Sequence, residues 1–227
     1  MDVGHPSANI DSMRKKAFVT GEFYHIYNRG TDKRVVFNNN YDFDRFLQSI
    51  AEFNSVIPIG SIYENSFIDH KLGRPTSKLV NIVCYCLNPN HYHMILEQCA
   101  EGGISEFMKR LSGGYTKYFN NKYKRNGVLF QGRFKSSHID SNEYLLHASA
   151  YVNLNNRVHK LKRDKFRSSL DEFIYKSSKE IFCKKDIILK QFKSKSEYED
   201  FVKEALDNML TRKDSLKEME NLLSLEA

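Results

Sequence analysis

The chain has 227 residues, of which 41% are hydrophobic, enough for one well-packed domain with an extension. No apolar run reaches the ~18 residues of a membrane span, and residues 1–16 lack the apolar core of a secretory signal, so we expect neither. The four cysteines do not have disulfide-scaffold spacing, which favours a reducing, cytoplasmic location. A formal net charge of +7 fits either an anionic partner or an ordinary basic surface.

The first half of the chain predicts a strand, a helix and a hairpin. Residues 17–28 are rich in aromatic and β-branched residues and predict a first strand. Apolar residues at helical spacing predict a helix over residues 39–54, with Asn40 as its N-cap. Residues 78–98 contain two apolar runs separated by "NPN", which predicts a tight β-hairpin.

The second half predicts a helix, a strand and a further helix. We expect a helix over residues 103–125, with a break at Gly113-Gly114 as the alternative. Residues 127–139 predict a fourth strand region. Residues 141–156 predict another helix, because Ser141 is a good N-cap and an acidic residue lies in the first turn.

This element order is that of the split βαβ, or ferredoxin-like, arrangement. We therefore predict an α+β fold with an antiparallel sheet and one added helix. Charged, helical segments follow residue 162, so we divide the chain into a domain at residues 12–162 and a helical C-terminal extension at residues 163–227.

Residues 108–135 are strongly basic and contain no Asp or Glu. Tyr and Phe residues are interleaved with the Lys and Arg residues, a pattern typical of single-stranded nucleic-acid binding. The alternative interpretation is an amphipathic helix whose aromatic residues belong to the core.

The sequence "CLNPNHYHMILE" (86–97) places two histidines one residue apart. On a strand, His91 and His93 point to one face of the sheet and Tyr92 to the other. Two neutral imidazoles on one strand face can converge on a single metal ion. These two residues alone are a weak signal for a metal site.

The rival metal site combines this pair with Cys84 and Cys86 as four zinc ligands. A three-residue loop places both cysteines on the face of Tyr92, whereas a two-residue loop brings Cys86 opposite His93. Tyr92, Met94 and Leu96 form an apolar face that small thiols fit well, so we favour the first register over a zinc site.

The last predicted helix of the domain carries Tyr151 and Asn155, four residues apart and so neighbours on one helix face. A tyrosine is a possible nucleophile and an asparagine supplies a neutral oxygen ligand. Taken without context, either residue is more often part of the packing.

Four segments together resemble the single-tyrosine HUH transposases of small insertion sequences, and in particular their relatives associated with repetitive extragenic palindromes. These segments are "FYHIYNRG" (23–30), "CLNPNHYHMIL" (86–96), "GGYTKYFNNKYKRNGVLFQGRFKS" (113–136) and "YLLHASAYVNLNNRVH" (144–159). Relatives often have a proline where this chain continues with Asn156-Arg157.

The resemblance implies a DNA transposase that acts in transposition and recombination as a metal-dependent endonuclease and strand transferase. It implies Tyr151 as the nucleophile, forming a 5′-phosphotyrosine intermediate, and His91, His93 and Asn155 as ligands of Mg²⁺ or Mn²⁺. The implied partner is single-stranded DNA with hairpin elements, and the palindrome-associated group implies a monomer rather than a homodimer.

With a DNA substrate, the basic residues become candidate phosphate contacts. The candidates are Lys117, Lys122, Lys124, Arg125, Arg133 and Lys135. Two alternatives stay open at this point: a non-catalytic, RRM-like binder of single strands, and a replication initiator or relaxase with the same chemistry.

Overall fold

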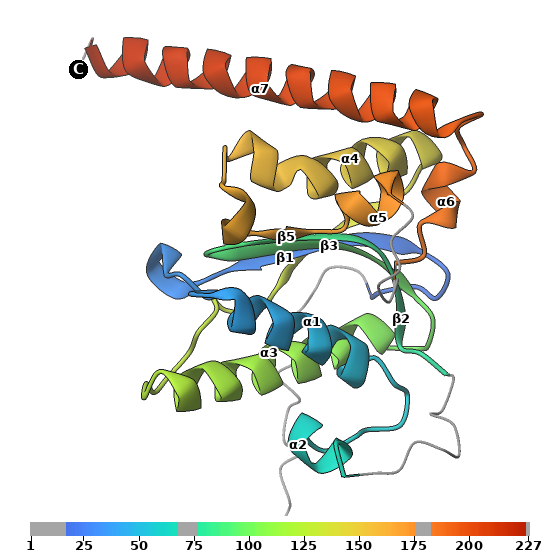
Figure 1. Ribbon diagram of the computed structural model, residues 1–227, viewed down its shortest axis with the longest axis vertical. Coiled ribbons are helices and arrows are strands. Elements are labelled where there is room, and N and C mark those ends of the chain that lie inside the picture. Colours follow the sequence, from blue (N-terminus) through green and yellow to red (C-terminus); the bar gives the residue numbers. More distant parts are fainter. Residues whose placement is uncertain (1–16, 68–76, 176–182, 226–227) are drawn as a thin grey trace, which may run out of the picture.

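The computed structural model describes residues 17–67, 77–175 and 183–225 (Figure 1). Residues 12–16 of the predicted domain and parts of the predicted extension therefore lie outside the described residues. The elements are β1 (Phe23–Arg29), α1 (Asn40–Phe53), α2 (Ile62–Asn65), β2 (Val80–Asn88), β3 (His91–Gln98), α3 (Gly103–Lys122), β4 (Lys135–Ile139), α4 (Asn142–Val158), β5 (Arg167–Ser168), α5 (Leu170–Ile174), α6 (Asp186–Leu189) and α7 (Lys195–Leu225).

The strands form one antiparallel sheet in the order β4-β1-β3-β2-β5. Strands β1 to β4 with α1 and α3 are the split βαβ arrangement, so the predicted α+β, ferredoxin-like fold with an added helix is confirmed. The fifth strand was not predicted. It belongs to the C-terminal part of the chain and pairs with β2.

Helices cover both faces of the sheet (Figure 1). Helices α1 and α3 lie on one face, α4 lies on the other, and α7 lies outside α4. Side-chain alternation along β3 divides the core accordingly. Tyr92, Met94 and Leu96 are buried with α1 and α3, whereas Ile95 is buried with α4. The odd-numbered residues of β3 therefore face the helix that carries Tyr151.

Local chemistry explains how helices α1 and α4 begin. Ser141 accepts a hydrogen bond from the backbone N–H of Tyr144, which confirms it as the N-cap of α4. The predicted cap of α1 was wrong by one residue, because the Asn39 side chain, not that of Asn40, accepts from the backbone N–H of Asp42. Both helices otherwise begin within one residue of the prediction.

The helix predicted over residues 103–125 is present as α3, and the alternative of a break at Gly113-Gly114 is wrong. A Cβ on Gly114 would lie 2.6 Å from the ring of Phe53. Gly114 thus permits close packing of α3 on α1 instead of breaking the helix. Strand β1 begins at Phe23, and β4 occupies only Lys135–Ile139 of the region predicted as strand.

The predicted hairpin is present, but the favoured register was wrong. Asn88 pairs with His91 and Cys86 with His93, which leaves a two-residue loop. Cys86 therefore lies on the histidine face, within the core beneath α4. Burial raises the pKa of Cys86 to about 12, and its thiol donates to the side-chain oxygen of Asn88 (3.5 Å). A protonated, buried thiol is a poor zinc ligand.

The part of the chain predicted as a helical extension contains helices α5, α6 and α7 as well as the short β5. Tyr198 of α7 is fully buried, and Asn153 of α4 donates a hydrogen bond to its hydroxyl (3.4 Å). The extension therefore supports the outer side of α4. Among the described residues, no helix combines the length and apolarity required to cross a bilayer.

Candidate active site

Strand β3 and helix α4 bring the predicted nucleophile next to the histidine pair within one chain. The ring centroids of His91 and His93 are 5.3 Å apart, and the Tyr151 ring lies 5.6 Å from that of His93 in an edge-on arrangement. Tyr151 keeps 39% of its surface exposed, whereas His93 is buried. The phenol is therefore close to the imidazole of His93 and still open to a substrate.

Asn155 lies one turn after Tyr151, and its side chain converges on His91. Its oxygen Oδ1 is 3.0 Å from Nε2 of His91, and Asn88 donates through Nδ2 to both atoms, at 2.6 Å and 2.9 Å. Nδ1 of His91 lies 2.7 Å from the side-chain oxygen of Asn90. With the Nδ1 proton donated to that oxygen, Nε2 carries a free lone pair.

Nε2 of His91 and Oδ1 of Asn155 thus lie side by side, 3.0 Å apart. This separation is close to the ~2.9 Å between adjacent ligands that each lie 2.0–2.1 Å from an octahedral cation. The spacing of the two atoms therefore fits Mg²⁺ or Mn²⁺. Within the described residues, no group of three or more His, Cys, Asp or Glu side chains is suited to a metal.

His25 of β1 fixes the orientation of His93. Its Nε2 lies 2.9 Å from Nδ1 of His93, and the two rings stack with centroids 5.1 Å apart. A hydrogen bond at Nδ1 leaves Nε2 of His93 as the nitrogen available to a metal ion. Ligating histidines in proteins are commonly held in this way through the other ring nitrogen.

Burial keeps these imidazoles neutral. It lowers the pKa of His93 to about 2, with further lowering by the nearby charges of His25, His91 and His159, and it lowers the pKa of His25 to about 4. Burial also lowers the pKa of His91, although the hydrogen bond with Asn155 opposes the shift. Neutral imidazole is the form that binds metal ions.

The phenol of Tyr151 is protonated at neutral pH. Burial raises its pKa above the usual value of about 10, while a hydrogen bond with the Asn155 side chain opposes the rise. Attack by Tyr151 therefore requires the loss of a proton as the new bond forms. Asn155 is placed to stabilise the resulting charge on the phenolic oxygen.

Four residues of this site were missed by the sequence analysis: His25, Asn88, Asn90 and His159. The ring of His159 lies 5.2 Å from that of His91. His159 follows Tyr151 and Asn155 at helical spacing, so the i, i+4, i+8 pattern could have indicated it. His25 and Asn88 act through cross-strand contacts, for which the sequence contains no periodic signal.

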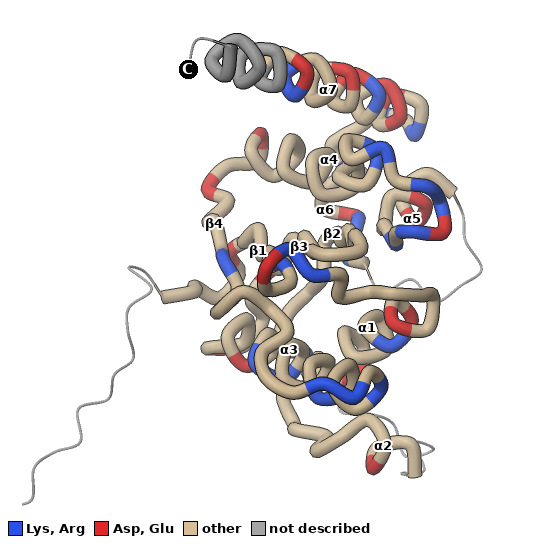
Figure 2. The backbone as a smooth tube through the Cα atoms, turned by 90° about the vertical axis from the view of Figure 1, so that its left-hand side faces the viewer, with Lys and Arg blue, Asp and Glu red and all other residues tan. Residues whose placement is uncertain are grey.

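The predicted DNA-contacting residues fall into two groups. Lys117, Lys122, Lys124 and Arg125 lie on or just after α3, on the face opposite α4 (Figure 2). Arg133 lies two residues before β4, and Lys135 is the first residue of β4. Lys135 pairs with Tyr27, whose ring stacks 5.7 Å from that of His93. The strand pairing thus places Lys135 on the side of the sheet that carries the site.

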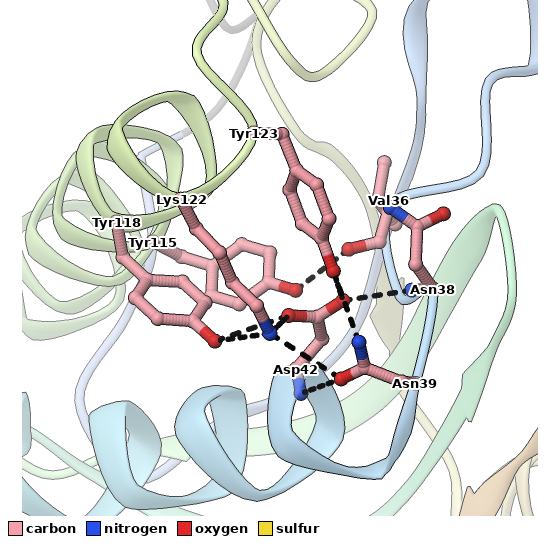
Figure 3. Close-up of polar contacts among 8 residues, drawn as sticks. All are labelled: Val36, Asn38, Asn39, Asp42, Tyr115, Tyr118, Lys122 and Tyr123. Atoms are coloured by element: carbon pink, nitrogen blue, oxygen red, sulfur yellow. Dashed lines mark hydrogen bonds and ion pairs between the residues drawn. The ribbon is translucent and has the colours of Figure 1, made fainter.

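Lys122 also has a structural partner. Its ammonium group is 2.7 Å from Oδ1 of Asp42, a fully buried carboxylate that also accepts from Tyr118 and Tyr123 (Figure 3). Of the interleaved aromatic residues, Tyr115, Phe119 and Phe130 are buried. For these three, the interpretation as core residues is correct.

The family comparison supports the resemblance seen in the sequence. Residues 69–155 match the family model described as "Transposase IS200 like". The structure resembles that of a REP-associated tyrosine transposase bound to a REP hairpin, with 15% identity, a TM-score of 0.47, and coverage of 78% of this chain and 93% of that one. A comparison with curated proteins finds no match. The matched range contains His91, His93, Tyr151 and Asn155, and this segment is similar to IS200-like transposases.

Proposed function

We propose that this protein is a metal-dependent endonuclease and strand transferase that acts on single-stranded DNA through Tyr151. The observation that carries the proposal is the placement of an exposed phenol beside two neutral imidazoles and a converging amide oxygen, all within one chain. The match of residues 69–155 to IS200-like transposases agrees with this chemistry.

In the proposed reaction, the phenolic oxygen of Tyr151 attacks the phosphorus of a phosphodiester. A bond between that oxygen and phosphorus forms, and the bond to the 3′-oxygen breaks. The phenol loses its proton and the leaving oxygen gains one, which gives a 5′-phosphotyrosine link and a free 3′-hydroxyl. Because the covalent link conserves the energy of the broken bond, a second 3′-hydroxyl can displace Tyr151 without ATP.

We propose that His91, His93 and Asn155 hold Mg²⁺ or Mn²⁺ at the scissile phosphate. The ion would withdraw charge from the phosphate oxygens and offset the charge that develops during attack. His25 and Asn90 orient the two imidazoles, and Asn155 joins the metal site to the nucleophile. Since all of these residues come from one chain, we propose a monomer that cleaves in cis.

The proposed substrate is a single strand that carries hairpins. Tyr151 is exposed on the surface of α4. The backbone of an unpaired strand is flexible enough to bring a phosphate to this phenol. The resemblance to palindrome-associated transposases motivates the hairpin element. Arg133 and Lys135 are the predicted phosphate contacts nearest to the site.

The test is incubation of a labelled single strand, taken from the hairpins that flank the gene, with Mg²⁺ or Mn²⁺. A protein–DNA band that survives denaturant is expected for the parent chain and absent for Tyr151→Phe. Tyr144→Phe is the matched control, since Tyr144 lies on the same helix with 41% of its surface exposed. An adduct that survives in Tyr151→Phe would overturn the assignment, and no adduct with either metal would favour a non-catalytic binder.

A further inference from the structure

A second candidate site lies beside the proposed active site, in a cavity of about 320 Å³ between the end of α4 and the segment that leads into α5. Three arginines line it, Arg157, Arg163 and Arg167, against one carboxylate, that of Asp171. The cavity therefore carries two more positive than negative side chains. Figure 2 shows basic residues gathered along the segment that joins α4 to α5.

The three guanidinium groups are held to different extents. Arg167 is held at α1, where it donates to Oδ1 of Asn40 (3.0 Å), lies over the ring of Phe43 and forms an ion pair with Asp44 (3.8 Å). Arg163 forms an exposed ion pair with Asp171 (3.3 Å), a kind of pair that contributes little and exchanges readily. Arg157 is exposed, and its side chain has no hydrogen-bond or ion-pair partner among the described residues. The cavity thus offers two available anion-binding groups, those of Arg157 and Arg163.

The sheet register places this cavity close to the nucleophile. Cys86 of β2 pairs with His93 on one side and with Ser168, which lines the cavity, on the other. Two strand spacings separate His93 from Ser168, about 10 Å. Residues paired directly across an antiparallel sheet point to the same face, so both lie beneath α4. A single strand bound at the nucleophile can therefore reach the cavity within a few nucleotides.

From this geometry we propose that the cavity binds one nucleotide of the single strand within a few positions of the scissile phosphate. Arg157 and Arg163 contact its phosphate, and the half-buried ring of Phe166, which also lines the cavity, stacks on its base. The inference rests on the proposed function and deepens it. It gives Asn156-Arg157, where relatives often have a proline, and the beginning of the C-terminal extension a role in positioning the substrate.

The test uses the full chain carrying Tyr151→Phe, so that binding is measured without covalent capture. The probe is a fluorescent, mixed-sequence 20-nucleotide single strand, titrated between about 50 and 200 mM salt. The double variant Arg157→Ala/Arg163→Ala leaves the anchored Arg167 in place. The matched control is Lys193→Ala/Lys203→Ala, which removes two exposed charges near the start of α7.

We expect the arginine variant to bind at least roughly tenfold more weakly than the control, because a charged hydrogen bond contributes about this factor. The salt dependence should become shallower by about 1.4, twice the value of ~0.7 for one phosphate contact on a single strand. Phe166→Leu should weaken binding without changing that slope, since stacking releases no counterions. Binding by the arginine variant equal to that of the control would overturn the proposal.

The outcomes for the site and for the proposed function are separable. If the parent chain forms the adduct but the arginine variant binds DNA as tightly as the control, the nucleotide site alone is rejected. Weaker binding by the arginine variant without any adduct rejects the cleavage chemistry and supports the nucleotide site. Parent-like binding by Phe166→Leu rejects the stacked base and leaves a phosphate contact only.

Discussion

On the face of the sheet covered by α1 and α3, Asp42 is fully buried and surrounded by donors. Its two oxygens accept from Lys122, Tyr118, Tyr123 and the backbone N–H of Asn38, at 2.7 to 3.0 Å (Figure 3). Each strong acceptor site of the carboxylate is thus matched by a donor. Such a network is satisfied without any ligand.

On the face covered by α4, neutral polar groups converge instead. Nε2 of His91 and Oδ1 of Asn155 lie 3.0 Å apart, and Nδ2 of Asn88 lies within 2.9 Å of both. The network around Asp42 already contains its own cation, the ammonium group of Lys122. The cluster of His91, Asn88 and Asn155 contains no charged side chain, so the two clusters should respond differently to an added metal ion.

The largest expected effect is the loss of metal-dependent cleavage in His91→Ala. Removing a metal ligand should lower adduct formation by more than the 10–100-fold typical of residues that only orient a ligand. The free energy of unfolding should change by less than about 1 kcal/mol, because His91 is only partly buried. Denaturing gels and urea unfolding measure the two effects. His138→Ala is the matched control on β4, and undiminished cleavage at low metal concentration would contradict the ligand role.

The opposite result is expected for Asp42→Ala. It removes the common acceptor of three side chains and should lower the free energy of unfolding by about 2–4 kcal/mol. Affinity for Mn²⁺ should stay unchanged in the folded protein, because Asp42 lies on the other face. Urea unfolding and Mn²⁺ titration are the measurements. Asp44→Ala, at an exposed position of the same helix, should change stability by less than about 0.5 kcal/mol. Equal losses in the two variants would show that the network does not stabilise the fold.

A smaller effect is expected at His25, which orients a proposed metal ligand but does not bind the ion itself. His25→Ala should weaken Mn²⁺ binding about 10–100-fold, because His93 loses the partner that fixes its ring and tautomer. His25→Gln should retain much of the affinity, since its amide can still bond with Nδ1 of His93. Calorimetric Mn²⁺ titration in the absence of DNA measures this directly. Parent-like affinity in His25→Ala would assign His25 to packing alone.

The hydrogen-bond network around Asp42 should also make the free energy of unfolding depend on pH in the acid range. Burial tends to raise the pKa of Asp42, but the hydrogen bonds from Lys122, Tyr123, Asn38 and Tyr118 outweigh it, so the net pKa is lowered. The stabilisation is therefore fully present above the unfolded pKa of about 4 and is lost as the pH falls through the folded pKa. The difference in unfolding free energy between the parent and Asp42→Asn should shrink as the pH falls below about 4. A constant difference would place the titration elsewhere.

The periodicity of the sequence predicted the strands and helices that carry the His91 site and the Asp42 network, because periodicity reflects contacts between residues close in sequence. Alternation placed His91 and His93 on one face, and helical spacing placed Tyr151 beside Asn155. The register of the hairpin was not predictable in this way, because apolar alternation is compatible with a loop of two or three residues. His25 meets His93 across 68 residues of sequence, and Asp42 meets donors 76 to 81 residues away. Residues Arg167–Ser168 are too few to show a strand period.

The smallest expected effect separates the predicted DNA contacts by the face on which they lie. Lys135 and Lys117 are both exposed, but only Lys135 is on the strand next to β1, opposite Tyr27. Lys135→Ala should weaken binding of a single strand a few-fold and reduce the salt dependence by about 0.7, the value for one lost phosphate contact. Lys117→Ala should leave both unchanged, because α3 covers the face away from Tyr151. Fluorescence titration at several salt concentrations compares them. Equal effects would mean that the DNA also contacts the face covered by α1 and α3. The division between a structural and a functional face of the sheet would then no longer hold for DNA binding.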